Sequence, residues 1–367
     1  MLATVSTVYP GFLIGALSVQ VSDEFAISEA VYGWGLGSFF LAATAGSVVL
    51  GRLVQRIGPR RQILAALTVA VGVNLFIAFG ATSWVQLAGA LAVCGFVNAG
   101  NQTAVNLALT QAQVPRLGLA IALKQSGMPT AAMLSGLMVP LIALTLGWRW
   151  AYVVGAVLAV AGIVLVLMVI APVVVGDTIV TTRPVSTRHD LAVAAAAGGF
   201  LSFGAGSLNA WTVGSGVDAG LSEGTAGLLL SLGAATGIVL RVFVGSKLDA
   251  MIRRPFLIAG LMVLVGAIGV AFMSIRVPGL HIAATLLAFA GGWVWPVFTN
   301  YGIMRTNAEA AGAVTGITQS GVYIGVFTAP LLTGWLIETY GYSTMWIVVA
   351  ASFTIGSGLA LSVRHRF

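Results

Sequence analysis

Charged side chains are scarce in this sequence. Asp, Glu, Lys and Arg together make up 7% of the 367 residues, whereas 59% are hydrophobic. Soluble domains carry about 25% charged residues, so the composition excludes an ordinary soluble protein. Apolar runs of about 20 residues, the length that crosses the hydrocarbon core of a bilayer, recur along the chain. The sequence therefore predicts an all-α integral membrane protein that has the lipid bilayer as its surroundings.

Groups that catalyse reactions or hold metals are also rare. The histidines, His189, His281 and His365, fall in loops, at edges of apolar runs or in the tail, and no run holds a carboxylate pair or an HExxH pattern. No nucleotide-binding loop of the GxxxxGK[ST] type is present. An enzyme needs acids, bases, nucleophiles or metal ligands that converge. We therefore expect no enzyme, no metal, no cofactor and no ATP-driven pump within this chain.

Cysteine and a leader segment are the remaining absences. The single cysteine, Cys94, lies within an apolar run, so it cannot form an internal disulfide and should serve in packing. No basic segment precedes the first apolar run, which predicts that there is no cleavable signal peptide. This missing basic flank suggests a late start or a trimmed tail.

The apolar runs form two sets of six. The expected spans are residues 2–21, 31–51, 62–81, 84–108, 117–141, 149–171, 191–213, 225–246, 255–274, 279–303, 312–336 and 342–363. We therefore predict twelve transmembrane helices in two pseudo-symmetric bundles. The N-terminal bundle covers residues 1–171, a cytoplasmic connector covers 172–190, and the C-terminal bundle covers 191–367.

An internal repeat relates the two sets. Adding 194 to a residue number between about 28 and 147 places Ser28-Glu29 on Ser222-Glu223 and Gln125-Ser126-Gly127 on Gln319-Ser320-Gly321 without a gap. The Ser-Glu pairs should cap the helices that they precede, because a hydroxyl and an anion are both favourable at a helix N-terminus. A part in a substrate gate is the alternative. Duplicated hydrophobic segments are a feature of transporter folds.

A basic stretch from Gly51 to Arg61 follows the second span and recurs from Gly245 to Pro255 after the eighth. We expect both copies to form turns. Their shared pattern is GxLxDRxGRR-like, carried by Gly51, Arg56, Gly58, Arg60, Arg61, Gly245, Asp249, Arg253 and Arg254. Together with the repeat, the pattern resembles the major facilitator superfamily of secondary transporters. The first copy departs from it, because Gln55 occupies the acidic position.

That resemblance implies two six-helix bundles that rock about a site near the bilayer midplane. It also implies a cytoplasmic gate in which the acidic residue of the motif faces the N-terminus of a helix in the opposite bundle. Asp249 would fill this role, with the start of the fifth span near Gly118 as its partner. Gln55 cannot supply the charge, so the gate should be asymmetric.

The positions of the cations predict the orientation of the chain. The formal charge is +7, but thirteen of the seventeen Lys and Arg residues fall on one side if the N-terminus is cytoplasmic. They are Arg52, Arg56, Arg60, Arg61, Arg116, Arg183, Arg188, Lys247, Arg253, Arg254, Arg305, Arg364 and Arg366. This is the positive-inside pattern. We expect a plasma-membrane protein with both termini in the cytoplasm and no nucleic-acid partner.

Polar side chains inside the spans give the candidate substrate site. A charge deep in a bilayer is costly, so Lys124 needs compensation: its stem could reach the cytoplasmic surface, it could bind an anion, or a carboxylate could pair with it. Arg241 could be structural or could contact substrate. Amides inside spans serve either as links between helices or as ligand contacts. The candidates are Asn101, Gln102, Asn106, Lys124, Gln125, Trp295, Asn300, Gln319 and Tyr323.

A shorter resemblance narrows the expected substrate. Lys124-Gln125-Ser126-Gly127, followed by Gly147-Trp148-Arg149-Trp150, looks like the cyanate permease-like branch of the superfamily. It implies a small-molecule substrate of anionic character. We expect the protein to be a monomer. A drug exporter and a non-transporting sensor are the alternatives. The exporters' GPxxGG pattern and their arginine in the fourth span are absent, which counts against drug export.

Overall fold

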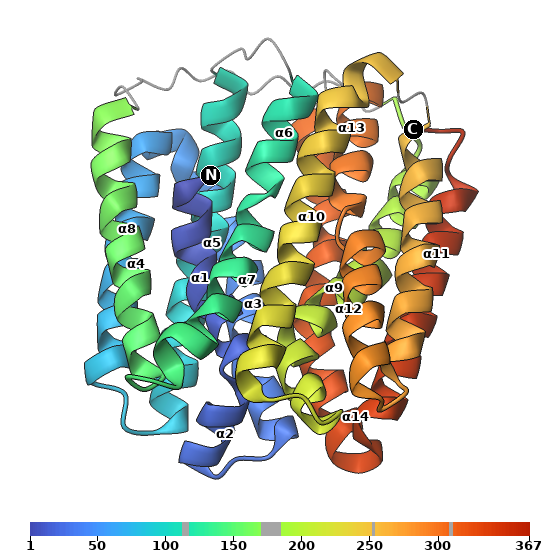
Figure 1. The fold of residues 1–367 in the computed structure, drawn as a ribbon. Coiled ribbons are helices and arrows are strands. Elements are labelled where there is room, and N and C mark those ends of the chain that lie inside the picture. The colour runs from blue at the N-terminus through green and yellow to red at the C-terminus, as the bar shows by residue number, and fades with distance from the viewer. Residues whose placement is uncertain (112–116, 170–184, 252–253, 308–310) are drawn as a thin grey trace.

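The computed structural model describes residues 1–367 with the exception of 112–116, 170–184, 252–253 and 308–310. Every regular element in these described ranges is a helix, and the helices run roughly parallel to one another (Figure 1). In chain order they are α1 (Leu2–Ala16), α2 (Ser18–Phe25), α3 (Glu29–Ile57), α4 (Pro59–Phe79), α5 (Trp84–Gln111), α6 (Leu117–Gln125), α7 (Gly127–Met138), the π-helix η1 (Val139–Ala143), α8 (Arg149–Val169), α9 (Arg188–Asp218), α10 (Glu223–Met251), α11 (Pro255–Met273), α12 (Pro278–Gly292), α13 (Trp295–Thr306) and α14 (Ala311–Ser362).

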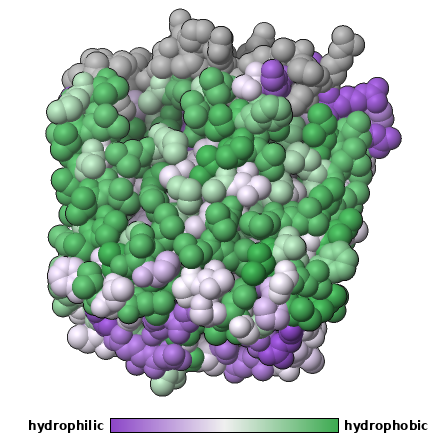
Figure 2. Space-filling view, in the orientation of Figure 1, coloured by the Kyte–Doolittle hydropathy of each residue, from purple (hydrophilic) through white to green (hydrophobic). Residues whose placement is uncertain are grey.

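The surface has the character of a membrane protein. A broad belt of hydrophobic side chains covers the middle of the molecule, and hydrophilic side chains gather at the rims (Figure 2). Both chain ends lie toward one end of the bundle, and α2 lies at the other (Figure 1). Following the predicted orientation, we call the end that carries α2 the outer end and the opposite end the inner end.

The number of spans is settled only in part. Among the described residues, eight helices are long and apolar enough to cross a membrane, or up to ten if two bent pairs each form one span. α5 is not counted although it has 28 residues, because its amides lower its mean hydropathy. α14 is counted once although it joins two helices at Gly341, whose φ is 79°. The chain is therefore an all-α, multi-pass membrane protein, and twelve spans remain a prediction.

The predicted helix caps are confirmed. The Ser28 Oγ accepts a hydrogen bond from the Val31 N–H at 3.5 Å at the start of α3, and the Ser222 Oγ accepts one from the Thr225 N–H at 3.3 Å before α10. Each hydroxyl satisfies a backbone donor that the first helical turn leaves free.

The expectation that the basic stretches form turns is wrong. α3 continues through Arg56 to Ile57, only Gly58 interrupts it, and α4 begins directly at Pro59. Arg and Leu favour helix, so the chain leaves the helix only where Gly58 adopts φ 82° and proline can occupy a first helical position. In the second copy α10 likewise extends to Met251. The cations of the first stretch and Lys247 of the second therefore lie on helix ends.

The helical hydrogen-bond pattern of two predicted spans is broken in the middle, although each still counts as one candidate membrane span. The fifth divides into α6 and α7 at Ser126, and the tenth divides into α12 and α13 at Trp293 and Val294. Prolines follow both breaks, at Pro129 and Pro296. A proline has no N–H to continue the helical hydrogen bonds, so each break leaves backbone carbonyls without a helical donor.

Glycines join the two halves of the chain near the outer end. A Cβ on Gly33 of α3 would lie 2.2 Å from the Pro330 carbonyl oxygen of α14, and one on Gly136 of α7 would lie 2.4 Å from the Gly227 oxygen of α10. Such approaches are possible only without a side chain, as in other close contacts between membrane helices. We call these two contacts the glycine seam.

Polar bonds reinforce the closure of the outer end. The Gln20 Nε2 donates to Glu223 at 2.5 Å, and the Ala30 N–H donates to Glu338 at 3.2 Å. Each bond joins a residue of the first half to a carboxylate of the second. The described helices are thus held closely together at this end of the bundle.

Candidate functional site

Arg241 is the central residue of the candidate site. It lies on α10 about 15 Å from the inner end of the helix, at a rise of 1.5 Å per residue, and only 5% of its surface is exposed. Its Nε donates to the Trp293 carbonyl oxygen at 3.0 Å, and its Nη2 donates to the same oxygen. Its Nη1 donates to the Gln125 carbonyl oxygen. The guanidinium therefore connects α10 to both broken spans.

The helix breaks explain why these two oxygens are available. In a continuous helix the Gln125 oxygen would accept from the N–H of residue 129, but that residue is Pro129. The Trp293 oxygen would accept from the Val297 N–H, which instead donates to Val294 at 3.2 Å. Unpaired backbone oxygens are costly within a membrane. Arg241 satisfies both of them, one in each half of the chain.

Lys124 lies at the same break and brings a second cation. It is half-buried at the end of α6, and its Nζ donates to the Gln125 Oε1 at 3.4 Å. Gln125 thus contacts Lys124 through its side chain and Arg241 through its main chain. Neither cation forms an ion pair with a carboxylate of the described residues. Of the three interpretations of Lys124, a carboxylate partner therefore finds no support in the described part of the chain.

Asn101 links helices. Its Nδ2 donates to the Ala3 oxygen and to the Thr7 Oγ1, each at 3.0 Å, and the Thr7 Oγ1 in turn donates to Asn98 at 2.9 Å. These bonds join α1 to α5. The donor side of Asn101 is therefore used in packing, whereas its Oδ1 is buried without a partner among the described residues.

Gln102 and Trp295 carry polar atoms that the described protein leaves unpaired. Gln102 is 6% exposed, and neither its Oε1 nor its Nε2 has a hydrogen-bond partner in the described ranges. The same holds for the Nε1 of Trp295, which is 5% exposed. An unpaired buried polar group is costly, so such groups require water, a ligand or another conformation. Both residues thus remain candidates for contact with a polar solute.

The other candidates are less closely tied to this region. Asn106 is exposed, and Asn300, Gln319 and Tyr323 are partly buried. The structure thus brings together Lys124, Gln125 and Arg241. From the sequence alone, Arg241 could be structural or could contact substrate. The carbonyl of Trp293 was not anticipated. Pro129 indicates the free carbonyl of Gln125, whereas Pro296 removes the helical donor of Gly292 and not that of Trp293. Neither proline indicates the side chain that takes the free oxygen.

The gate motif can be followed only in part. Arg56 and Arg61 are exposed, and the Arg60 Nη2 donates to the Leu167 oxygen at 3.4 Å, which joins α4 to α8. Arg253 and the side chain of Asp249 lie outside the described residues. The contact between Asp249 and the start of α6 therefore stays a prediction.

The Gly-Trp-Arg-Trp segment forms a brace at the outer end. The Trp148 Nε1 donates to Glu24 at 2.6 Å, and Arg149 forms an ion pair with the same carboxylate. The Arg149 guanidinium lies 4.4 Å from the centre of a Trp148 ring and donates to the Ala81 oxygen at 2.9 Å. These contacts join α2 to α8 within the first half, so the segment has a structural role there.

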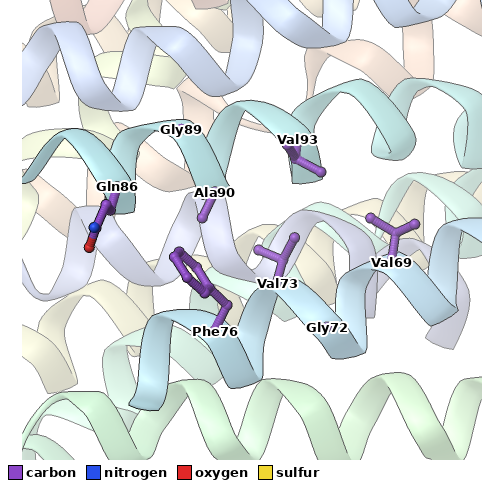
Figure 3. A pocket seen from close by; sticks show the side chains of 8 residues that line it. All are labelled: Val69, Gly72, Val73, Phe76, Gln86, Gly89, Ala90 and Val93. Atoms are coloured by element: carbon purple, nitrogen blue, oxygen red, sulfur yellow. The ribbon is translucent and has the colours of Figure 1, made fainter. Parts of the chain in front are cut away.

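A groove of about 650 Å³ between α4 and α5 is separate from this site (Figure 3). Figure 3 shows Val69, Val73 and Phe76 of α4 facing α5, with Gln86 at one end of the groove. Nearly all of its lining is apolar, and the Gln86 Oε1 already accepts from the Thr82 N–H at 2.8 Å. The groove therefore offers little to a polar solute.

Comparison with known families gives one matching family. The family model described as Major Facilitator Superfamily matches residues 1–276 and, in a second match, residues 191–366. Together these matches cover nearly the whole chain. No curated protein matches it.

Proposed function

The chain belongs to the major facilitator superfamily, a family of membrane transporters, and from this premise we propose that it moves a small anionic solute by alternating access. One observation carries the anionic character of the solute. Lys124 and Arg241 meet at Gln125, away from any described carboxylate. Positive charge in a membrane span is costly and marks functional sites. A solute anion would supply the missing negative charge.

The other polar groups fit the same role. Gln102 and Trp295 supply a buried amide and a buried indole N–H without protein partners in the described ranges. They lie on α5 and α13, in the first and second halves of the chain. When groups from both halves hold the solute, its contacts change whenever the halves move relative to one another. Alternating access requires such a connection between binding and movement.

We propose that the moving units are bundles over residues 1–171 and 191–367, joined by the connector over 172–190. The glycine seam and the bonds of Glu223 and Glu338 would separate when the outer end opens. We also propose that the protein is a monomer of the plasma membrane. Both termini would be cytoplasmic, because cations concentrate at the inner end.

Uptake into proteoliposomes tests the proposal. Radiolabelled acetate and thiocyanate serve as probes, with other small anions as competitors. We expect saturable uptake that small anions inhibit and that Lys124→Ala reduces at least about tenfold, because a charge-assisted contact is lost. Lys247→Ala, which removes an exposed cation of the same charge from α10, is the matched control and should leave uptake unchanged.

Three results would contradict the proposal. If Lys124→Ala and Lys247→Ala transport anions equally well, Lys124 is not part of the site. If cells that express the protein resist chemically unrelated hydrophobic compounds and the vesicles take up no anion, the protein is a drug exporter. If neither anions nor such compounds move, it is a sensor.

A further inference from the structure

We infer that Arg241 is a second cation of the anion site and that it selects a planar oxyanion of the carboxylate class. The inference rests on the proposed function, because it presumes that an anion binds beside Lys124. It goes further in naming the group that would read the shape of the anion.

Among the described residues, Arg241 has N–H donors without a partner. A guanidinium carries five N–H groups in a rigid plane, and the contacts with Trp293 and Gln125 involve its Nε, Nη1 and Nη2 once each. The two N–H groups that remain are one on Nη1 and one on Nη2. Two neighbouring donors in one plane match the paired oxygens of a carboxylate, whereas a lysine ammonium is a point charge without this preference.

The present partners of Arg241 do not neutralise it. Both are backbone carbonyls, which supply dipoles but no net charge. A buried cation is stable only when it is paired or hydrogen-bonded, and an anion satisfies it better than two carbonyls do. The described carboxylates lie at helix ends or in adjoining turns, away from this break. The missing negative charge is therefore one that a ligand can bring.

The location of Arg241 connects binding to movement. Its bond to Gln125 crosses from α10 in the second half to α6 in the first. A carboxylate that binds the two remaining N–H groups pulls the guanidinium toward itself and strains the bond between Nη1 and the Gln125 oxygen. Ligand and Gln125 thus pull on the same nitrogen, so occupancy of the site changes how firmly the halves are joined.

Thermal unfolding of the purified full-length protein measures this selectivity. Formate, acetate and benzoate are the planar probes, and chloride and thiocyanate are the spherical and linear ones, all as sodium salts at one ionic strength. We expect the carboxylates to stabilise the wild type at concentrations about tenfold lower than thiocyanate requires. Arg241→Lys should still bind anions but should lose this preference. Arg188→Lys, at an exposed arginine at the start of α9, is the matched control and should keep it.

A second variant leaves Arg241 in place. Pro129→Ala restores the N–H that a helix offers to the Gln125 oxygen, so that oxygen no longer depends on the guanidinium. We expect carboxylates to bind several-fold more tightly, because the Gln125 oxygen no longer holds the guanidinium away from them. This measurement also covers the case in which Arg241→Lys does not fold.

The outcomes separate the two proposals. If the wild type binds anions, Lys124→Ala abolishes binding and Arg241→Lys keeps the carboxylate preference, the inference about Arg241 is wrong and the proposed function stands. Unchanged or weaker carboxylate binding in Pro129→Ala would also overturn the inference. If no anion stabilises the wild type, the proposed anionic substrate fails and the inference fails with it.

Discussion

The glycine seam gives the most direct way to move the equilibrium between open and closed outer ends. A methyl group at Gly33 would lie 2.2 Å from the Pro330 oxygen and 3.0 Å from the Pro330 carbonyl carbon. Ordinary contact begins near 3.4 Å, so α3 and α14 must separate by about 1 Å. The obstacle is backbone and cannot rotate away. Gly33→Ala therefore penalises the conformation in which the outer end is closed.

The size of the effect follows from the cost of overpacking. An extra methyl group in a close-packed contact costs about 1–3 kcal/mol. The contact exists only when the outer end is closed, so this cost enters the equilibrium between the two conformations. It corresponds to a shift of about 5- to 150-fold toward the open outer end.

Distances between spin labels across the outer end test the prediction. Leu146 and Val277 are exposed there in the first and second halves, and each can be replaced by cysteine in a Cys94→Ala background. We expect Gly33→Ala to add a population with a longer distance. Gly72→Ala is the control, because it adds the same methyl group where no atom lies within 4 Å. If both variants fold and give the same distances, the seam does not control the outer end.

Two further predictions concern charges at the ends of the bundle. Asp249→Asn removes the charge that the family resemblance assigns to the cytoplasmic gate. The equilibrium of the resting state should therefore shift up to about fivefold toward the inward-open form. The accessibility of cysteines placed on the inner and outer cavity walls measures this shift. Unchanged accessibility would contradict the gate. Glu24→Gln should lower the free energy of unfolding by about 1 kcal/mol, because Arg149 loses its ion partner in a half-exposed site. The control is Asp23→Asn, which alters a neighbouring exposed carboxylate. The free energies of unfolding of the two variants, measured by thermal unfolding, should differ by that amount. Equal values would contradict the stabilising role of the contact between Glu24 and Arg149.

The class of the fold could be predicted because it depends on composition and periodicity. Apolar runs and scarce charge indicated a helical membrane protein, and the caps at Ser28 and Ser222 followed from local backbone chemistry. A run of cations looks like a loop, but arginine favours helix, so the basic stretch after the second span is helical up to Ile57. Gly58 and Pro59 are the residues that mark where the helix ends and the next begins.

The arrangement at Arg241 could not be predicted in the same way. Pro129 shows that the Gln125 carbonyl loses its helical donor, but the donor that replaces it comes from a residue 116 positions away. The sequence does not say which side chain will reach a free carbonyl across a packed interface. Asn101 shows the same limit, since its bonds to Ala3 and Thr7 depend on how α1 packs against α5.

The brace between Glu24 and Arg149 bears on how the protein is made. All of its members, including Trp148 and the Ala81 carbonyl, come from the first 150 residues. Domains tend to fold as units during synthesis, with the N-terminal part first. The brace can therefore form while the ribosome is still translating the second half, so the early helices have a fixed arrangement against which the later ones insert.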